Sequence, residues 1–199
     1  MIFISTAPQI RFFRLLFQKV IKTKAKLEVK NGTISSAKND ALIDVEGSTS
    51  YLVLREDITL ISTGGRACVY NTGGNALIDG NASLTSNAEW TSSMKRGTVQ
   101  TLTSGVTTIK GGTIINNRAS SSYAIAIELG TVTIGTEDGI YDIQNLIMQG
   151  ETNGIYALVN YSLYDGMIKG KTAAVNDESK ITGIETGATK VNDTDSGYN

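Results

Sequence analysis

The stretch Ile109-Lys110-Gly111-Gly112-Thr113-Ile114 joins the end of an alternating apolar run to a glycine turn and to a hydrophobic residue directly after the turn. The same unit recurs at 29–34, 134–140 and 163–168. A unit that returns every ~20–50 residues is typical of solenoid proteins, because one unit cannot bury its apolar side chains without the next. The repeat therefore predicts a solenoid.

The repeat is roughly 25 residues long when the units are aligned on the apolar residue before each glycine turn. The aligned residues are Val29, Leu60, Leu84, Ile109, Ile134 and Leu163. A second strand lies upstream in several units, and its aligned residues are Ala76, Thr101, Ala126 and Ala157. These alignments predict about six coils. They also predict an extra piece within 47–55 and an outward loop at 90–97.

A coil of about 25 residues with three short strands has the size expected of a parallel β-helix, in which each strand pairs with its equivalent about 4.8 Å away. Alternation then assigns the side chains to the two sides of each strand. We expect Val132 and Ile134 to point inward, with Thr131 and Thr133 outward. The predicted fold class is all-β, a right-handed parallel β-helix that spans 27–191.

Residues 1–26 differ from the repeats and form a separate predicted region. The segment 8–22 lacks glycine and carries a polar stripe at helical spacing opposite an apolar one, which is typical of an amphipathic helix. We expect this helix to cap the first coil, since an open coil end exposes its core and a strand edge. A membrane-surface anchor and an unstructured leader are the alternatives. At the other end, 192–199 has no repeat and is expected to fray.

The composition excludes several classes of site. The net charge is −1, with 18 Lys and Arg against 19 Asp and Glu, so no overall field favours nucleic acid. The absence of His and the presence of one Cys remove most zinc sites and the usual Ser-His and Cys-His nucleophile pairs. We expect Cys68 to be a small core residue. We also expect that the protein binds no cofactor. No apolar stretch reaches the ~20 residues that a membrane span needs.

The segments 110–117 and 126–134 resemble the right-handed β-helix repeats of bacterial surface and adhesin-like proteins, which commonly combine a Gly-Gly-Thr-Ile turn, an Asn-rich corner and an alternating strand. The likeness covers 27–187. It implies a secreted or cell-surface protein. We expect this protein not to be an enzyme, and to serve as an adhesin-type stalk or to contact a glycan or a host or cell-surface protein. Pectin-lyase-like enzymes and phage tail proteins use similar repeats. A polysaccharide lyase or hydrolase and a phage tail-fibre fragment are therefore the alternatives.

Acidic residues near two equivalent turns are the candidates for chemistry. Enzymes that act on polysaccharides use clustered Asp or Glu, in some cases with calcium. The catalytic candidates are Asp138, Asp142, Asp165 and Lys169, and the calcium candidates are Glu137, Asp138 and Asp165. Lys110 and Lys169 lie on neighbouring coils. The alternative is that these acids only shape turns, since Asp before Gly is preferred there.

Tyrosines are concentrated in the C-terminal half of the chain. An exposed aromatic ring beside Asn and Asp can stack on a sugar. The candidates for glycan contact are Tyr141, Tyr156, Tyr161 and Tyr164. The alternative is that the rings stack on one another from coil to coil.

Overall fold

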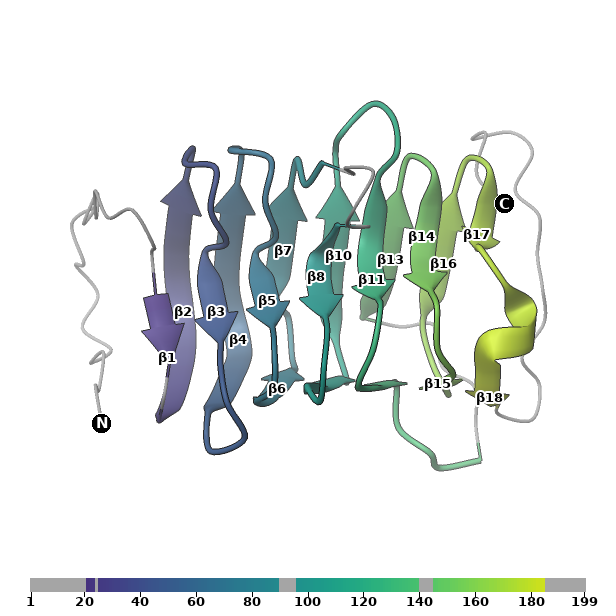
Figure 1. Cartoon of the computed structure of the whole chain (residues 1–199), viewed down its shortest axis with the longest axis horizontal. Helices are drawn as coiled ribbons and strands as arrows, with labels where there is room; N and C mark the ends of the chain where they lie inside the picture. Colours follow the sequence, from purple (N-terminus) through teal and green to yellow (C-terminus); the bar gives the residue numbers. More distant parts are fainter. Residues whose placement is uncertain (1–20, 24, 90–95, 140–144, 185–199) are drawn as a thin grey trace.

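The computed structural model describes residues 21–23, 25–89, 96–139 and 145–184, and these residues form a parallel β-solenoid (Figure 1). Its strands pair with the equivalent strands of the coils before and after them, as at β10 (Gly112–Asn116) and β13 (Leu146–Gly150). The all-β fold class predicted from the repeat is confirmed. Helical structure in the described part of the chain is the 3-10 turn η1 (Glu178–Lys180), and no described helix could cross a membrane.

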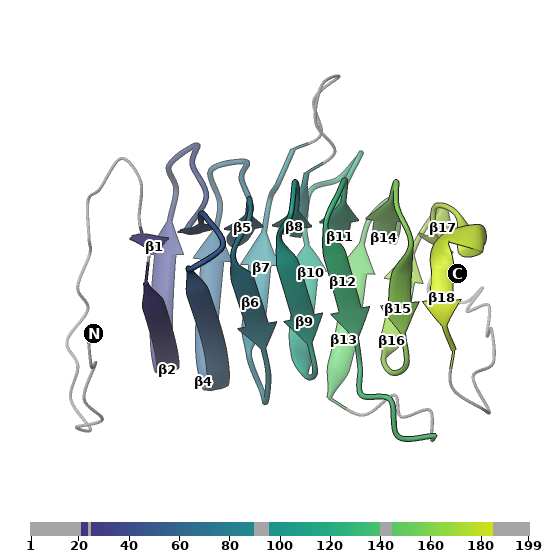
Figure 2. The same ribbon diagram turned by 60° about the horizontal axis from the view of Figure 1, so that its bottom comes forward.

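The strands lie on three faces that surround one core (Figures 1 and 2). Face 1 contains β1 (Ile21–Thr23), β3 (Ile43–Val45), β5 (Val69–Asn71), β8 (Gly97–Thr101), β11 (Tyr123–Ile127), β14 (Asn153–Ala157) and β17 (Ala173–Val175). Face 2 contains the first parts of β2 (Lys26–Ser36) and β4 (Tyr51–Ser62), then β6 (Asn75–Ile78), β9 (Val106–Ile109), β12 (Thr131–Ile134), β15 (Tyr161–Leu163) and β18 (Ile181–Gly183). Face 3 contains the second parts of β2 and β4, then β7 (Ser83–Ser86), β10, β13 and β16 (Met167–Gly170). The described strands thus make six coils with all three faces, and β17 and β18 begin another.

The core is built from columns of side chains that stack from coil to coil. On face 2 the inward column is Val29, Leu54, Ile78, Ile109, Ile134 and Leu163. On face 1 the corresponding column is Ile21, Ile43, Val69, Val99, Ile125, Ile155 and Val175. The predicted alternation in β12 is confirmed, because Val132 and Ile134 are buried and Thr131 is exposed.

The alignment from sequence mixed two of these columns. Leu60 and Leu84 lie on face 3, where they stack on Ile114, while the partner of Val29 on face 2 is Leu54. The alignment fails at this coil because β4 turns the corner between faces 2 and 3 without a glycine. The residue at the corner is Glu56, whose backbone lies at φ +58°. Residues 51–55, which we expected within an extra piece, are therefore part of β4.

The second alignment mixed faces in the same way. Ala76 lies in β6 on face 2, whereas Thr101 and Ala157 lie on face 1, in the column of Ile127. The two sets look alike in sequence because every face repeats once per coil. Only the strand pairing separates them.

The solenoid begins before the predicted boundary at Leu27. Ile21 and Lys22, expected at the end of the helix, lie in β1 and pair with Ile43 and Asp44. The remainder of the predicted helix and the tail at 192–199 lie outside the described residues.

The glycine turn that defines the repeat has a steric reason at Gly112. Its backbone lies at φ +103°, and a Cβ there would come within 2.3 Å of the Ala82 carbonyl oxygen on the preceding coil. Only glycine permits both the left-handed conformation and this close approach. The second glycine of the Gly-Gly-Thr-Ile sequence is thus required by the tight stacking of one turn on the next.

Candidate functional site

A groove follows the corner where face 2 turns into face 3. The turns of this corner lie along the lower edge of the molecule in Figure 2. The deeper part of the groove has a volume of about 390 Å³. The lining residues of this part are Asp79, Gly80, Asn81, Lys110, Gly111, Thr136, Asp138, Asn145, Leu146 and Asp165. An adjoining hollow shares Asp79, Gly80 and Asn81 and adds Asn31, Arg55, Glu56 and Asp57. We call the two together the corner groove.

The corner groove exists because each coil places polar residues beside its turn. Asp79 accepts a hydrogen bond from the backbone N–H of Gly80 at 2.8 Å, and Gly80 itself has φ +65°. Asp165 accepts one from the N–H of Thr136, on the preceding coil, at 2.7 Å. Asp79 therefore shapes its own turn, whereas Asp165 holds its turn against that of the preceding coil.

Side chains along the corner groove also bind successive coils to one another. Asn31 donates from Nδ2 to Glu56 Oε2 at 2.8 Å, and Asn81 donates from Nδ2 to Asp57 Oδ1 at 3.2 Å. The N–H of Asp57 donates back to Asn31 Oδ1 at 3.4 Å. Amides and carboxylates of the first three coils are thus linked to one another along this part of the groove.

The described lining carries more negative than positive charge. Its acids are Glu56, Asp57, Asp79, Asp138 and Asp165, and its bases are Arg55 and Lys110. Lys30, next to the groove, lies 3.5 Å from a carboxylate oxygen of Glu56 and 3.6 Å from one of Glu28. Lys110 is exposed and is the cation of the deeper part.

The structure brings together some of the predicted acidic residues and separates others. Asp138 and Asp165 both line the corner groove, as their equivalent turns predicted. Lys169 does not line it: this residue lies on face 3, opposite Gln149. The lysine that lies with these acids in the groove is Lys110, which we expected on a neighbouring coil. Asp142 lies outside the described residues.

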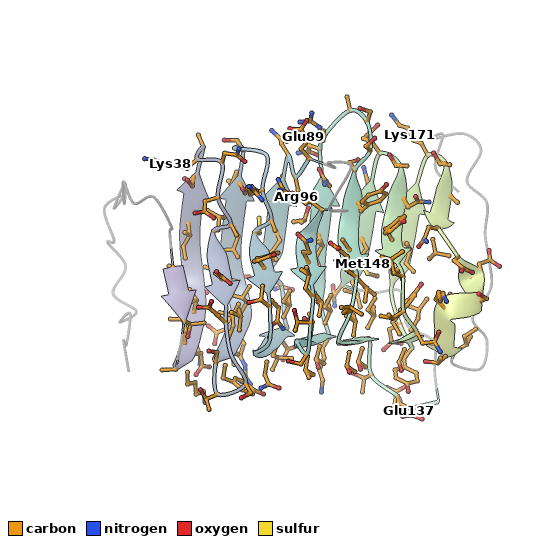
Figure 3. The ribbon with its side chains drawn as sticks, viewed as in Figure 1. Lys38, Glu89, Arg96, Glu137, Met148 and Lys171 are labelled. Atoms are coloured by element: carbon orange, nitrogen blue, oxygen red, sulfur yellow. The ribbon has the colours of Figure 1, made fainter. Side chains whose placement is uncertain are left out.

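The predicted calcium candidates do not form a metal site in the described part of the chain. Glu137 is exposed in the loop after β12, at the lower edge of Figure 3, and is not among the lining residues. No group of three or more His, Cys, Asp or Glu side chains among the described residues could hold a metal ion. The shared turn position therefore brought two of the three candidates, Asp138 and Asp165, to the groove.

The described tyrosines among the predicted glycan contacts are not lining residues of the corner groove. Tyr161 is buried in the core, with 2% of its surface exposed, and burial raises the pKa of its hydroxyl, so the prediction that it contacts a glycan is wrong. Tyr156 stacks on Tyr123 with ring centroids 4.8 Å apart. Tyr164 packs over Gly183, where a Cβ would lie 2.6 Å from the ring. Tyr141 lies outside the described residues.

Several groove residues escaped the reading of the sequence. Four residues that were not predicted as binding residues lie beside turns between faces 2 and 3, namely Asn31, Asp79, Asn81 and Asn145. The available signal was the return of Asp or Asn beside this turn in most coils. It was hidden because the misaligned columns placed turns of different corners together.

Cys68 has the predicted role of a small core residue. It is fully buried, and its thiol lies 3.2 Å from the Thr85 carbonyl oxygen. Burial raises the pKa of the thiol to about 12. At neutral pH it is therefore protonated and a poor nucleophile.

The corner groove is thus a shallow, polar and mostly acidic trough on a rigid scaffold, with one lysine in its deeper part. Comparison of the chain with protein-family models, with curated proteins and with solved structures found no match. The chain is a parallel β-solenoid.

Proposed function

We propose that this protein is a non-catalytic β-solenoid, secreted or displayed at a cell surface, that binds an extended glycan along the corner groove. The observation that carries the proposal is the continuity of the groove. Its two parts adjoin at Asp79, Gly80 and Asn81, and their lining residues together come from the first coil to the sixth.

A polymer of sugars fits such a trough for a chemical reason. Each sugar unit carries several hydroxyl groups that donate and accept hydrogen bonds, and specificity in binding sites comes from a few placed polar groups. The groove offers amides at Asn31, Asn81 and Asn145, carboxylates, and the Lys110 ammonium group. Because these groups recur from coil to coil, about 4.8 Å apart along the axis, a ligand that repeats along its own length can use them in turn.

The engagement of the carboxylates supports binding without cleavage. Hydrolysis of a glycosidic bond needs one carboxylic acid to deliver a proton and a second carboxylate to act beside it. Asp79 and Asp165 instead accept hydrogen bonds from backbone N–H groups of the turns. One oxygen of each carboxylate is thus occupied in holding a turn.

A polysaccharide lyase is the second candidate, and one observation favours it. Lys110 lies in the same open groove as Asp79, Asp138 and Asp165, which is the association of acids with a lateral base that such an enzyme needs. The alternatives differ in a measurable way, since a lyase releases an unsaturated product that absorbs ultraviolet light.

Binding is tested with the full chain on a glycan array, followed by titration of the best ligand. We expect Asn81→Ala, in the middle of the groove, to weaken binding about fivefold, as loss of one hydrogen bond does. Asn160→Ala is the matched control, because Asn160 is exposed on the corner between faces 1 and 2. No retained glycan, or equal loss in both variants, would overturn the proposal.

Catalysis is tested by incubating the same protein with polygalacturonate and alginate, with and without calcium. We expect no rise in ultraviolet absorbance. A rise that is lost in Asp138→Asn and in Lys110→Gln would replace the binding proposal by the lyase.

A further inference from the structure

We infer that the two ends of the solenoid bind one another, so that a second copy of this chain stacks head-to-tail on the first. The surfaces that meet are the strand edges of the first and the last described coils. These edges belong to β1 and β2 at one end of the molecule and to β17 and β18 at the other (Figure 1). The inference is independent of glycan binding along the corner groove.

Each end strand has a neighbouring strand on one side only among the described residues. On face 1, β1 pairs with β3 and β17 pairs with β14. On face 2, β2 pairs with β4 and β18 pairs with β15. A row of N–H and C=O groups at a sheet edge is a template for another strand. Each end of the solenoid can therefore continue the sheets of a second molecule.

The hydrogen-bonding groups of the two face 1 edges are complementary. Along a strand, the backbone N–H and C=O groups of successive residues point to opposite sides. The Asn176 N–H donates to a carbonyl oxygen of β14 at 3.2 Å, so its neighbour Val175 points its backbone groups to the edge. The Ile21 N–H donates to the carbonyl oxygen directly before β3 at 3.0 Å, so Lys22 points its backbone groups to the edge at the other end. When Ile21 stands in register with Val175, the Lys22 N–H faces the Val175 C=O.

The same register continues the hydrophobic core. Ile21 and Val175 are the two ends of the inward column of face 1, and Leu27 and Ile181 end one inward row of face 2. These four side chains are only partly buried, whereas Ile43, which stacks on Ile21, is 0% exposed. Stacking of two molecules would give the end coils the burial of the inner ones, and removal of apolar surface from water is favourable.

The direction of the strands decides which ends meet. Two like ends would meet with antiparallel strands, whereas the strand pairs at both ends of the solenoid are parallel. Two first coils would also bring together the lysines of β1 and β2, namely Lys22, Lys26 and Lys30, while the last coil carries Asp177 and Glu178. Exposed charges contribute little affinity, but complementary charges suppress the wrong orientation.

Face 3 leaves room for the rest of each chain. The last described strand on this face is β16, which belongs to the coil before β17 and β18. The chain passes through the faces in the order 1, 2, 3, so it enters β1 and leaves Ile184 at the two borders of face 3. Neither terminal segment therefore has to pass between the stacked strands of faces 1 and 2.

Sedimentation of the full chain over a range of concentrations tests the association. Each molecule has both ends, so head-to-tail contacts do not close, and we expect dimers, trimers and longer assemblies as the concentration rises. Proline lacks the N–H group and is tolerated on edge strands. Lys22→Pro should therefore block the first coil and Val175→Pro the last, and each variant alone should stay monomeric. Lys22→Ala and Val175→Ala keep the N–H group and are the matched controls, which should still associate.

A mixture of the two proline variants is the sharpest test. Lys22→Pro keeps an intact last coil and Val175→Pro an intact first coil, so equal amounts should form a dimer and nothing longer. Ile181→Glu blocks the last coil by placing a charge in the contact, and it should behave as Val175→Pro does. Circular dichroism of each variant should match that of the unmodified chain.

Three results would overturn the inference. The first is an unmodified chain that stays monomeric at every concentration, which would mean that the chain's own residues cover its ends, as the cap expected from the sequence would do. The second is a mixture of the two proline variants that forms no dimer. The third is a proline variant that associates on its own as the unmodified chain does.

Discussion

Two parts of the buried interior are held together in different ways. The aliphatic column of face 2, which includes Ile109 and Ile134, contains no polar group. At the corner between faces 1 and 2, a polar cluster of Asn71, Thr101 and Thr107 is just as completely buried. The column needs only side chains of suitable size, because apolar burial has no direction. The polar cluster at the corner needs hydrogen-bond donors and acceptors at specific positions, because a buried polar group without a partner is unfavourable.

The geometry of Asn71 shows why the corner is more demanding. Its Nδ2 donates to the Val106 carbonyl oxygen at 3.0 Å and to Thr107 Oγ1 at 3.1 Å. Its Oδ1 accepts from the N–H groups of Gly73 and Gly74 at 3.3 and 3.0 Å. One side chain thus replaces the strand hydrogen bonds that the backbone loses where it leaves face 1.

The largest effect is expected from a charge placed within the aliphatic column. Ile134→Asp buries an ionisable group without a partner and should lower the free energy of unfolding by more than about 4 kcal/mol. Denaturant titration followed by circular dichroism measures this loss. Thr133→Asp is the control on the outer side of the same strand and should cost less than about 1 kcal/mol. Equal costs would contradict the assignment of the two sides.

Removal of the polar side chain at the corner should cost less, but still substantially. Asn71→Ala leaves buried N–H and C=O groups without their partners, and we expect a loss of about 2–4 kcal/mol. The same denaturant titration measures it. Asn160→Ala, on the exposed part of this corner, should change stability by less than about 0.5 kcal/mol. A loss at Asn71 no greater than that would mean that water replaces its hydrogen bonds.

Two stacked serines on face 3 should respond with opposite signs. Ser62 and Ser86 are neighbours in register, and both are buried. Ser86 Oγ lies 2.7 Å from Thr98 Oγ1, whereas Ser62 Oγ has no hydrogen-bond partner among the described residues. Ser86→Ala should destabilise the fold by about 1 kcal/mol, and Ser62→Ala should stabilise it by a similar amount. Thermal melts of the two variants compare them, and a shared sign would contradict this reading of the serine column.

The smallest expected effect is at the edge of face 1 and depends on pH. Burial raises the pKa of Glu128, against the opposing effect of the hydrogen bond from Gln100 Nε2 at 2.6 Å. A carboxyl group with a raised pKa in the folded state stabilises the fold at low pH, and this contribution is lost as the pH rises through that pKa. Glu128→Gln keeps an oxygen acceptor without the charge, so it should raise the melting temperature at about pH 7 by at most about 2 °C.

At about pH 3, where glutamate is protonated in both the folded and the unfolded chain, the Glu128→Gln variant and the unmodified protein should melt together. A difference that is the same at both pH values would show that ionisation is not its cause.

The predicted acid pair shows how far a repeat can be used to find a site. Asp138 and Asp165 were placed together because their turns are equivalent, and both line the corner groove. Lys169 was placed with them by its coil alone, yet it lies on face 3. A repeat predicts which coil a residue belongs to, but the direction of its side chain depends on the face and on alternation.

Tyr161 makes the same point within a single strand. It lies two residues before Leu163, which packs against the core, so alternation places it inward as well. Its aromatic ring suggested contact with a glycan at the surface. Its inward position in the alternation of β15 excludes that contact. The alternation was therefore a better guide to this residue than its chemistry.

The sequence by itself determined the architecture, because a unit of alternating apolar residues and a glycine turn that returns every ~25 residues buries its apolar side chains by stacking on its own copies. The tertiary structure decided which residues share a column and which side chains meet at the corner groove. That choice depends on pairing between residues about 25 positions apart, and on a turn at Glu56 that takes a left-handed conformation without glycine. Local sequence carries no mark of such a turn, so the groove became visible only once the coils were stacked.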